Sequence, residues 1–289
     1  MSADFPIADA HQHFWDPRAN YHPWLCDATP IAFRYGDYAA LRRPYLPADY
    51  LADAGAHEVV KTVYVETQWD PRDPLGETAW VGRLRRETGL PTVMVAQAWL
   101  DREDVAGVLE RQAAHEFVRG VRHKPARGAM RDARWRAGYA RLARHGLRFD
   151  LQAPWTELGD AAALCRAFPD TPLVLNHAGL PADRSAEGIA GWKRALHTLA
   201  GCPNAAIKIS GIGVPGARWT PALNREIVLS AIEAFGTRRA MFASNFPVDS
   251  LCASFGEIYC GFREIANSLS ALEQRALFHD NAVRIYAME

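Results

Sequence analysis

Short apolar runs alternate with longer amphipathic segments along most of the chain. Eight runs rich in β-branched and other apolar residues are typical of strands: residues 5–11, 59–66, 91–100, 117–123, 147–152, 172–179, 205–211 and 240–248. Segments rich in Ala, Leu, Arg and Glu predict helices at 76–88, 101–115, 132–145, 157–168 and 221–236, and along most of 254–288. This alternation predicts an α/β protein.

The number of strand–helix units predicts the architecture. Eight units in 289 residues is the expected size of a (β/α)8 TIM barrel. A doubly wound open sheet is the competing fold, because strands buried on both faces suit either one. The strand count favours the barrel, and without an internal repeat or a linker we predict a single domain over residues 1–289.

One long segment interrupts the alternation between the first two predicted strands. Residues 14–57 are rich in Pro, Tyr and Trp, and include Trp15, Tyr21, Trp24 and Tyr35. Loops of this length are usually functional, and in a barrel this one would lie at the carboxyl ends of the strands. We predict a lid-like insertion whose aromatic side chains orient a substrate; an aromatic brace over the barrel rim is the alternative.

Composition narrows the classes of partner. Lys plus Arg and Asp plus Glu both number 33, which argues against nucleic acid or an anionic membrane as the main partner. The sequence shows neither a transmembrane helix nor a secretory signal, so we predict a cytoplasmic protein. Five cysteines without a C-x-x-C pair indicate a reducing compartment. The apolar C-terminal region and the long loop could support a homodimer.

Two histidines end the first predicted strand. Residues two apart in a strand point to the same face, so His11 and His13 are predicted to aim at one point of the barrel mouth. Two neutral imidazoles at one point suit a divalent metal such as zinc. Rim histidines bonded to the backbone are the alternative.

Polar side chains also end most of the other predicted strands. They are Glu66 on the second, Arg122 and His123 on the fourth, Asp150 and Gln152 on the fifth, His177 on the sixth, Lys208 and Ser210 on the seventh, and Asn245 on the eighth, with Asp249 just beyond. A structural core does not require polar groups to converge. A small-molecule site at the mouth of a barrel does, so we predict one there.

Several of these stretches carry a family resemblance. DAHQHFWDP, VRGVRH, LVLNHAG, IKISG, ASNFPVD and LFHDNAVRIYAM resemble the amidohydrolase superfamily, in particular the amidohydrolase family 2 branch with sugar lactonases and pyrone-dicarboxylate lactonase. The resemblance implies a (β/α)8 barrel with its site at the strand ends. His11, His13 and His177 match family histidines that bind a divalent cation in metal-dependent members. In lactonases that work without metal, these histidines polarise the carbonyl.

The eighth strand departs from the family pattern. Members usually carry Asp after the Ser, whereas this chain reads Ser244–Asn245. An amide cannot accept a proton at useful pH and is a poorer metal ligand than a carboxylate. The fifth strand offers Asp150 and Gln152 where strongly metal-binding members carry His. Two metal positions are therefore weakened.

Two hypotheses for the metal follow from this departure. Either His11, His13 and His177, with or without Glu66, hold a divalent metal, or the protein is metal-free. In both cases the general base must come from elsewhere, and the sequence leaves Asp249, Asp150 and Glu66 as candidates.

Each of these carboxylates has a structural alternative. Asp249 could cap the helix that follows it, Glu66 could pair with a rim Arg, and Asp150 could pair with Arg122 or Lys208.

Basic residues follow the fourth predicted strand in the segment 120–136. Arg122 or Arg127 could clamp a substrate carboxylate in a bidentate manner, with His123, Lys208 and Gln152 beside them. The arginines further along are predicted to form a solvated helix face. The glycines of GIGVPG, residues 211–216, are predicted to form a loop and no nucleotide site, because no helix follows them directly.

Together these features predict an enzyme that hydrolyses a small lactone carrying a carboxylate or several hydroxyls. The three histidines, with or without metal, would polarise the carbonyl, a carboxylate would activate water, and Asn245 would make one hydrogen bond. A metal-dependent decarboxylase of an aromatic or unsaturated acid is one alternative. A non-catalytic barrel that binds a small metabolite is the other, because Asn245 replaces the usual acid.

Overall fold

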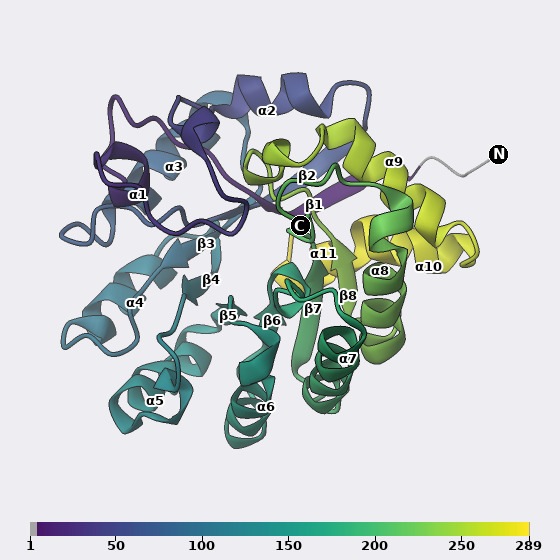
Figure 1. The fold of residues 1–289 in the computed structure, drawn as a ribbon. Coiled ribbons are helices and arrows are strands. Elements are labelled where there is room, and N and C mark those ends of the chain that lie inside the picture. The colour runs from purple at the N-terminus through teal and green to yellow at the C-terminus, as the bar shows by residue number, and fades with distance from the viewer. Residues whose placement is uncertain (1–4, 289) are drawn as a thin grey trace.

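The computed structural model describes residues 5–288 and forms a barrel of eight parallel strands (Figure 1). The strands pair in chain order: β1 (Ile7–Gln12), β2 (Val59–Val65), β3 (Val93–Gln97), β4 (Val118–His123), β5 (Arg148–Leu151), β6 (Leu173–Leu175), β7 (Ala205–Ile209) and β8 (Ala240–Phe242). Asn245 N donates to His11 O, and His13 N donates to Phe246 O, which joins the chain after β8 to β1. The predicted (β/α)8 barrel is confirmed, and every predicted strand segment overlaps one strand.

Helices surround the strands on the outside (Figure 1). They are α1 (Pro23–Cys26), α2 (Pro47–Ala54), α3 (Gly76–Thr88), α4 (Val105–Ala113), α5 (Ala133–Tyr139), α6 (Leu158–Ala167), α7 (Ala186–Ala200), α8 (Pro221–Phe235), α9 (Phe255–Ala266), α10 (Ala271–Arg275) and α11 (Asn281–Tyr286). Within residues 5–288, none of them has the length and apolar character needed to cross a membrane.

The C-terminal segment lies at the amino ends of the strands. Small strand side chains such as Ala10 and Val95 form one apolar cluster with Tyr286 and Met288. Arg148, the first residue of β5, donates to the carbonyl of Ile285. This packing covers the amino end of the barrel and leaves the opposite end, the carboxyl ends of the strands, for a site.

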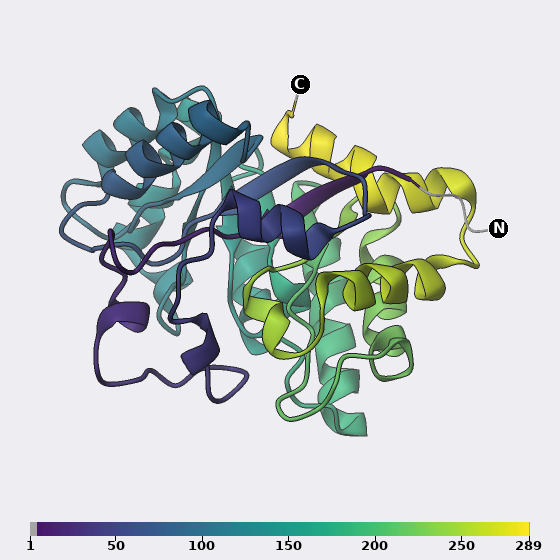
Figure 2. The ribbon, with the colours of Figure 1, turned by 90° about the horizontal axis from the view of Figure 1, so that it is seen from above.

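The segment between β1 and β2 crosses the carboxyl end of the barrel. It carries α1 and α2, and Figure 2 shows it leaving the strands and returning at α2. Trp24 Nε1 donates to Thr67 O just after β2, at 2.8 Å, and Tyr35 OH donates to Asp249 Oδ1 after β8, at 3.0 Å. These two hydrogen bonds attach the segment to the chain that follows β2 and to the chain that follows β8, the two strands beside β1.

Candidate functional site

Three histidines meet at the carboxyl ends of β1 and β6. The ring centroid of His11 lies 4.9 Å from that of His13 and 4.6 Å from that of His177. All three side chains are buried. The structure therefore brings together the histidines that the strand pattern singled out.

The hydrogen bond of His13 fixes its tautomer. Its Nδ1 lies 2.7 Å from the carbonyl oxygen of Val65, and since a carbonyl only accepts, Nδ1 carries the proton. Burial, with the charge of Arg122, lowers the pKa of His13 to about 3, so the ring is neutral near pH 7. Nε2 is therefore a hydrogen-bond acceptor, which suits a bound water better than the carbonyl that we expected this residue to polarise.

Burial also keeps the other two imidazoles neutral. It lowers the pKa of His11 and His177 well below the usual value, with further contributions from Lys208 and Arg34 respectively. His177 Nδ1 lies 3.0 Å from Ser210 Oγ. Neither ring nitrogen of His11 has a hydrogen-bond partner among residues 5–288.

A pocket of about 310 Å³ opens beside these rings. Its lining combines two of the histidines, three cations, amides and apolar side chains: His13, Trp15, Trp24, Ile31, Ala32, Phe33, Arg34, Thr67, Gln68, Arg122, Lys124, Gln152, His177, Leu180, Asn245 and Val248. We call it the mouth pocket. Because His13 and His177 line it together with Arg34, Arg122 and Lys124, neutral acceptors and positive charges share one cavity.

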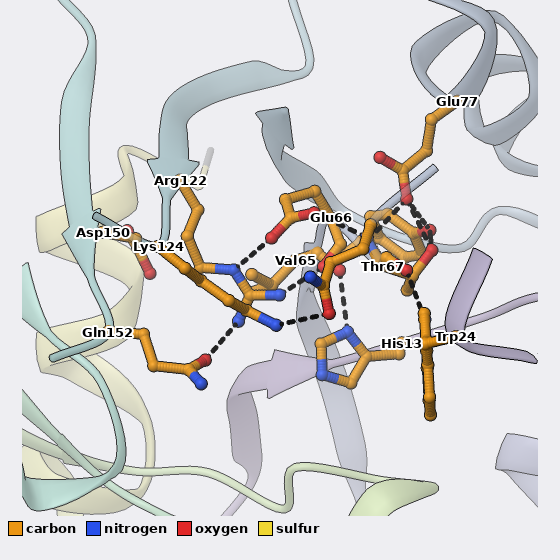
Figure 3. A network of polar contacts seen from close by, with 12 residues as sticks. His13, Trp24, Val65, Glu66, Thr67, Glu77, Arg122, Lys124, Asp150 and Gln152 are labelled. Carbon is orange, nitrogen blue, oxygen red and sulfur yellow. Dashed lines mark hydrogen bonds and ion pairs between the residues drawn. The ribbon is translucent and has the colours of Figure 1, made fainter. Parts of the chain in front are cut away.

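Arg122 is fixed between two strands (Figure 3). Its Nε donates to Glu66 Oε1 at 2.5 Å, a second nitrogen donates to the Glu66 carbonyl, and Nη1 donates to Gln152 Oε1 at 3.2 Å. The Glu66 pair is 3% exposed on each side, so its charges are screened little by solvent. Arg122 therefore reaches the pocket as a pre-positioned cation.

Lys124 follows the end of β4 and shares the pocket with Arg122. Its Nζ donates to Gln68 Oε1 at 3.0 Å. Burial, followed by the charge of Arg122, lowers the pKa of Lys124 to about 7. Both protonation states of this amine are therefore populated near neutral pH, as suits proton transfer.

Arg34 comes from the segment between β1 and β2. Its Nη2 lies 3.6 Å from Asp249 Oδ1, and its buried Nη1 finds no hydrogen-bond partner within the described chain. A buried guanidinium donor without a partner is costly, unless a ligand supplies the acceptor. Arg34 therefore lines the mouth pocket and carries an unused hydrogen-bond donor.

Asp249 organises the chain after β7 and β8. Its Oδ1 accepts from Asn245 Nδ2 at 2.6 Å and from Tyr35 OH, and its Oδ2 accepts from Gly211 N at 3.0 Å. Burial raises the pKa of Asp249, while Arg34 opposes that rise. Its carboxylate is 2% exposed and faces donors of the protein. Asn245, with a φ of +54°, stands between it and the pocket.

Gly211 shows how closely these groups approach. It has a φ of +58°, and a Cβ there would lie 2.6 Å from His177 Nδ1 and 2.8 Å from Arg34 Nη2. Only glycine fits such a position without displacing both side chains. The glycine-rich stretch 211–216 thus begins as a loop, as predicted, and it packs against the site.

Two predicted site residues lie deeper in the barrel than we expected. Lys208 Nζ pairs with Asp150 Oδ2 at 2.6 Å, and both side chains are fully buried. Tyr286 OH donates to Asp150 Oδ1 at 2.8 Å. The structure therefore does not bring the ammonium of Lys208 or the carboxylate of Asp150 to the mouth pocket.

The aromatic residues of the segment 14–57 divide into three positions. Trp15 and Trp24 line the mouth pocket, while Tyr35 lies behind it on Asp249. Tyr21 is 37% exposed and donates to Asp27 Oδ1, outside the pocket. Arg127 is exposed as well, so the structure favours Arg122 of the two predicted clamp residues.

Sequence reasoning did not single out Arg34, Lys124 or Gln68 as site residues. Lys124 had one usable signal, since it directly follows a strand that ends in Arg122 and His123. Gln68 stands out only in the structure, where it has a φ of +56°, which is rare for a non-glycine residue and common at functional sites. Arg34 had none, because its place depends on how the loop folds back.

The histidines offer only part of a metal site. Unpartnered nitrogens on His11 and a free Nε2 on His13 are donors that zinc accepts. Among the described residues, however, no three His, Cys, Asp or Glu side chains are placed together as ligands. Arg34, Arg122 and Lys208 also lower the pKa of the imidazoles through their charge.

Comparison with known proteins finds relatives over almost the whole chain. A family model described as amidohydrolase matches residues 8–288. A protein of Sinorhizobium fredii is 40% identical, covering 98% of this chain and 99% of its own length. L-fucono-1,5-lactonase from Burkholderia multivorans is 31% identical, and the match covers 97% of this chain and 95% of the lactonase. A crystal structure of a Burkholderia multivorans amidohydrolase with bound zinc, 29% identical, superposes with a TM-score of 0.82 over 98% of this chain and all of the other.

Proposed function

Because this chain belongs to the amidohydrolase family and is a hydrolase of that type, we propose that it opens a small lactone by attack of water at the barrel mouth. One observation carries the proposal. The mouth pocket places the neutral acceptor nitrogen of His13 in one cavity with the cations Arg34, Arg122 and Lys124. The similarity to L-fucono-1,5-lactonase supports the same reaction class.

The cations match the charge that lactone hydrolysis creates. Water attack on a neutral ester carbonyl gives a tetrahedral oxyanion, and ring opening gives a carboxylic acid, which ionises to a carboxylate. The unpartnered Nη1 of Arg34 donates to that oxyanion, and Arg122, held by Glu66 and Gln152, adds a fixed positive charge. Donors positioned before the reaction stabilise the transition state more than they stabilise the substrate.

Two acceptors orient the attacking water. His13 offers Nε2, because its Nδ1 proton is bound by Val65. Asn245 lines the pocket and donates its Nδ2 to Asp249, which leaves its carbonyl oxygen free to accept. A water that donates one hydrogen to either acceptor has its oxygen lone pair directed at the lactone carbonyl carbon, and it keeps its second hydrogen for the base. Asp249 acts here as a positioning residue.

Lys124 transfers the proton. Its uncharged amine takes a proton from water as the new C–O bond forms, and its ammonium returns that proton to the ring oxygen as the C–O bond of the lactone breaks. The carboxylates named from the sequence are less suited, since Asp150 and Glu66 are in close ion pairs and Asp249 is enclosed by donors. The pKa of Lys124, about 7, matches this double task.

A divalent metal is an alternative source of polarisation, because the related Burkholderia amidohydrolase binds zinc. His11, His13 and His177 would hold it, and it would supply Lewis-acid activation of the carbonyl. The proton transfer by Lys124 and the charge stabilisation by Arg34 use residues of the chain itself.

The substrate is a lactone with a carboxylate or several hydroxyl groups. The test is ring opening by the purified protein on two panels, neutral aldonolactones and carboxylated lactones, followed as acid release at constant pH. We expect opening of at least one compound above the spontaneous rate. Release of CO2 from aromatic acids, with no lactone opened, would instead support a decarboxylase.

A further inference from the structure

A second pocket of about 270 Å³ adjoins the mouth pocket. Its lining is rich in tryptophan and proline: Pro23, Trp24, Ile31, Glu66, Gln68, Trp69, Pro71, Gln97, Trp99, Arg122, His123 and Lys124. Trp24, Ile31, Gln68, Arg122 and Lys124 line both pockets. The hydrogen bond from Lys124 to Gln68 therefore lies at the border between the two spaces. We call this space the tryptophan pocket.

Flat apolar side chains form its walls. Trp24 lies in α1, in the segment after β1, and Trp69 and Trp99 lie in the loops after β2 and β3. Trp99 is half-buried, and the guanidinium of Arg102 stacks 5.2 Å from its ring centroid, which holds its orientation. Indole faces pack well against the flat C–H face of a ring.

Gln97 supplies an unused acceptor in this pocket. It ends β3, its side chain is 5% exposed, and its Oε1 has no hydrogen-bond partner in the part of the chain that the structure describes. A buried amide oxygen left without a donor costs free energy. A ligand that donates a hydrogen bond at this point would remove that cost.

His123 supplies a donor to the same pocket. Its Nδ1 accepts from Leu100 N at 3.2 Å and from Trp135 Nε1 at 3.0 Å, so the proton of the neutral ring resides on Nε2. Burial lowers the pKa of His123, which keeps the ring neutral. An acceptor on Gln97 and a donor on His123 match a hydroxyl group, which both donates and accepts.

We propose that the tryptophan pocket is a second subsite, which binds a hydroxyl-bearing ring attached to the lactone. The lactone occupies the mouth pocket beside His13, and its substituent passes Lys124 and packs on Trp99. The substrate is therefore a lactone with two rings, such as an aldonolactone that carries a glycosyl group. This inference rests on the proposed lactone hydrolysis for the identity of the first ring only.

The test compares a one-ring and a two-ring lactone. Glucono-1,5-lactone fills the mouth pocket alone, whereas cellobiono-1,5-lactone adds a second sugar ring. We expect Gln97→Leu and Trp99→Ala each to lower kcat/KM for the two-ring lactone about tenfold and to leave that for the one-ring lactone within about twofold. Gln152→Leu is the matched control: Gln152 lines the mouth pocket and not the tryptophan pocket, so both substrates should suffer alike.

A binding measurement without turnover separates this inference from the proposed function. Cellobionate, the open acid, should quench the fluorescence of the wild-type protein with a Kd below about 10 mM, and Gln97→Leu should weaken binding about tenfold. If no lactone is opened but this binding depends on Gln97, the lactonase proposal fails and the subsite stands. Equal binding of gluconate and cellobionate, or an unchanged Kd in Gln97→Leu, would overturn the subsite.

Discussion

Asn245 donates its side-chain amide to the carboxylate of Asp249, with Nδ2 and Oδ1 2.6 Å apart. The amide stands where the family resemblance implies a carboxylate, and the carboxylate of Asp249 lies four residues later. The pair therefore presents an amide oxygen to the pocket and keeps its negative charge enclosed by Tyr35, Gly211 and Arg34.

Exchanging the two members of this pair tests whether their order matters. Asn245→Asp alone places two carboxylates in contact, and Asp249→Asn alone turns an amide toward its donors. Each should lower the free energy of unfolding by about 1–3 kcal/mol. The double exchange restores one donor and one acceptor, so it should recover part of that loss. Denaturant unfolding of the four proteins measures the coupling, and purely additive losses would contradict the pairing.

Arg34 should contribute to catalysis through its unpartnered Nη1. Arg34→Met removes the donor to the oxyanion, and we expect kcat to fall about 100-fold with a smaller change in KM. Arg42→Met is the matched control from the same segment, since Arg42 stacks on Tyr38 and does not line the mouth pocket. Steady-state kinetics on one lactone measures both. An Arg34→Met enzyme as active as the control would contradict the role.

The activity should depend on the protonation of Lys124. Its pKa is about 7 and the uncharged amine is the base, so kcat/KM should be low below pH 6 and rise to a plateau above pH 8. Lys124→Gln should lose most of the activity, and the rise of kcat/KM between pH 6 and pH 8 should disappear. Lys193→Gln, which removes an exposed lysine paired with Glu226, should keep the wild-type profile. If kcat/KM of Lys124→Gln still rises over the same pH range, another group is the base.

Glu77 should make stability fall as the pH rises. It is buried, it accepts from Tyr64 OH, Thr67 N and Thr67 Oγ1, and burial raises its pKa from 4.5 to about 7. The folded protein then binds more protons than the unfolded chain between these values, so this contribution is full below pH 4.5 and is lost through pH 7. The shift corresponds to about 3 kcal/mol.

Glu77→Gln isolates that contribution. The amide keeps an acceptor for Thr67 and Tyr64 but does not titrate in this range. As the pH rises from 4.5 to 7, the free energy of unfolding of the wild type should therefore fall relative to that of Glu77→Gln. A difference that stays constant across this range would show that the carboxyl titrates normally in the folded protein.

The sequence allowed prediction of the barrel and of the histidines for the same reason. Strand periodicity determines which face a side chain occupies, so the two-residue spacing of His11 and His13 was enough to place them together. Periodicity does not determine depth along the barrel axis. Asp150 and Lys208 share the interior with the site but lie deeper, where Tyr286 of the C-terminal segment reaches them.

Other parts of the site depend on long loops. Arg34 and Tyr35 reach Asp249 only because the segment 14–57 folds over the barrel. No local sequence pattern predicts the course of that segment. Lys124 was missed for a different reason. Its place beside Arg122 and its shifted pKa depend on burial, which a charged residue in a basic stretch does not reveal.

The most direct test is lactone opening before and after exhaustive chelation, with the metal content of each sample measured. We predict that a substrate lactone is opened at the same rate by protein with far less than one metal per chain, because Arg34, Lys124 and His13 carry the reaction. Activity that is lost on chelation and restored by zinc would contradict this account and move the chemistry to an ion held by His11, His13 and His177. Failure to open any lactone in either sample would contradict the proposed function itself.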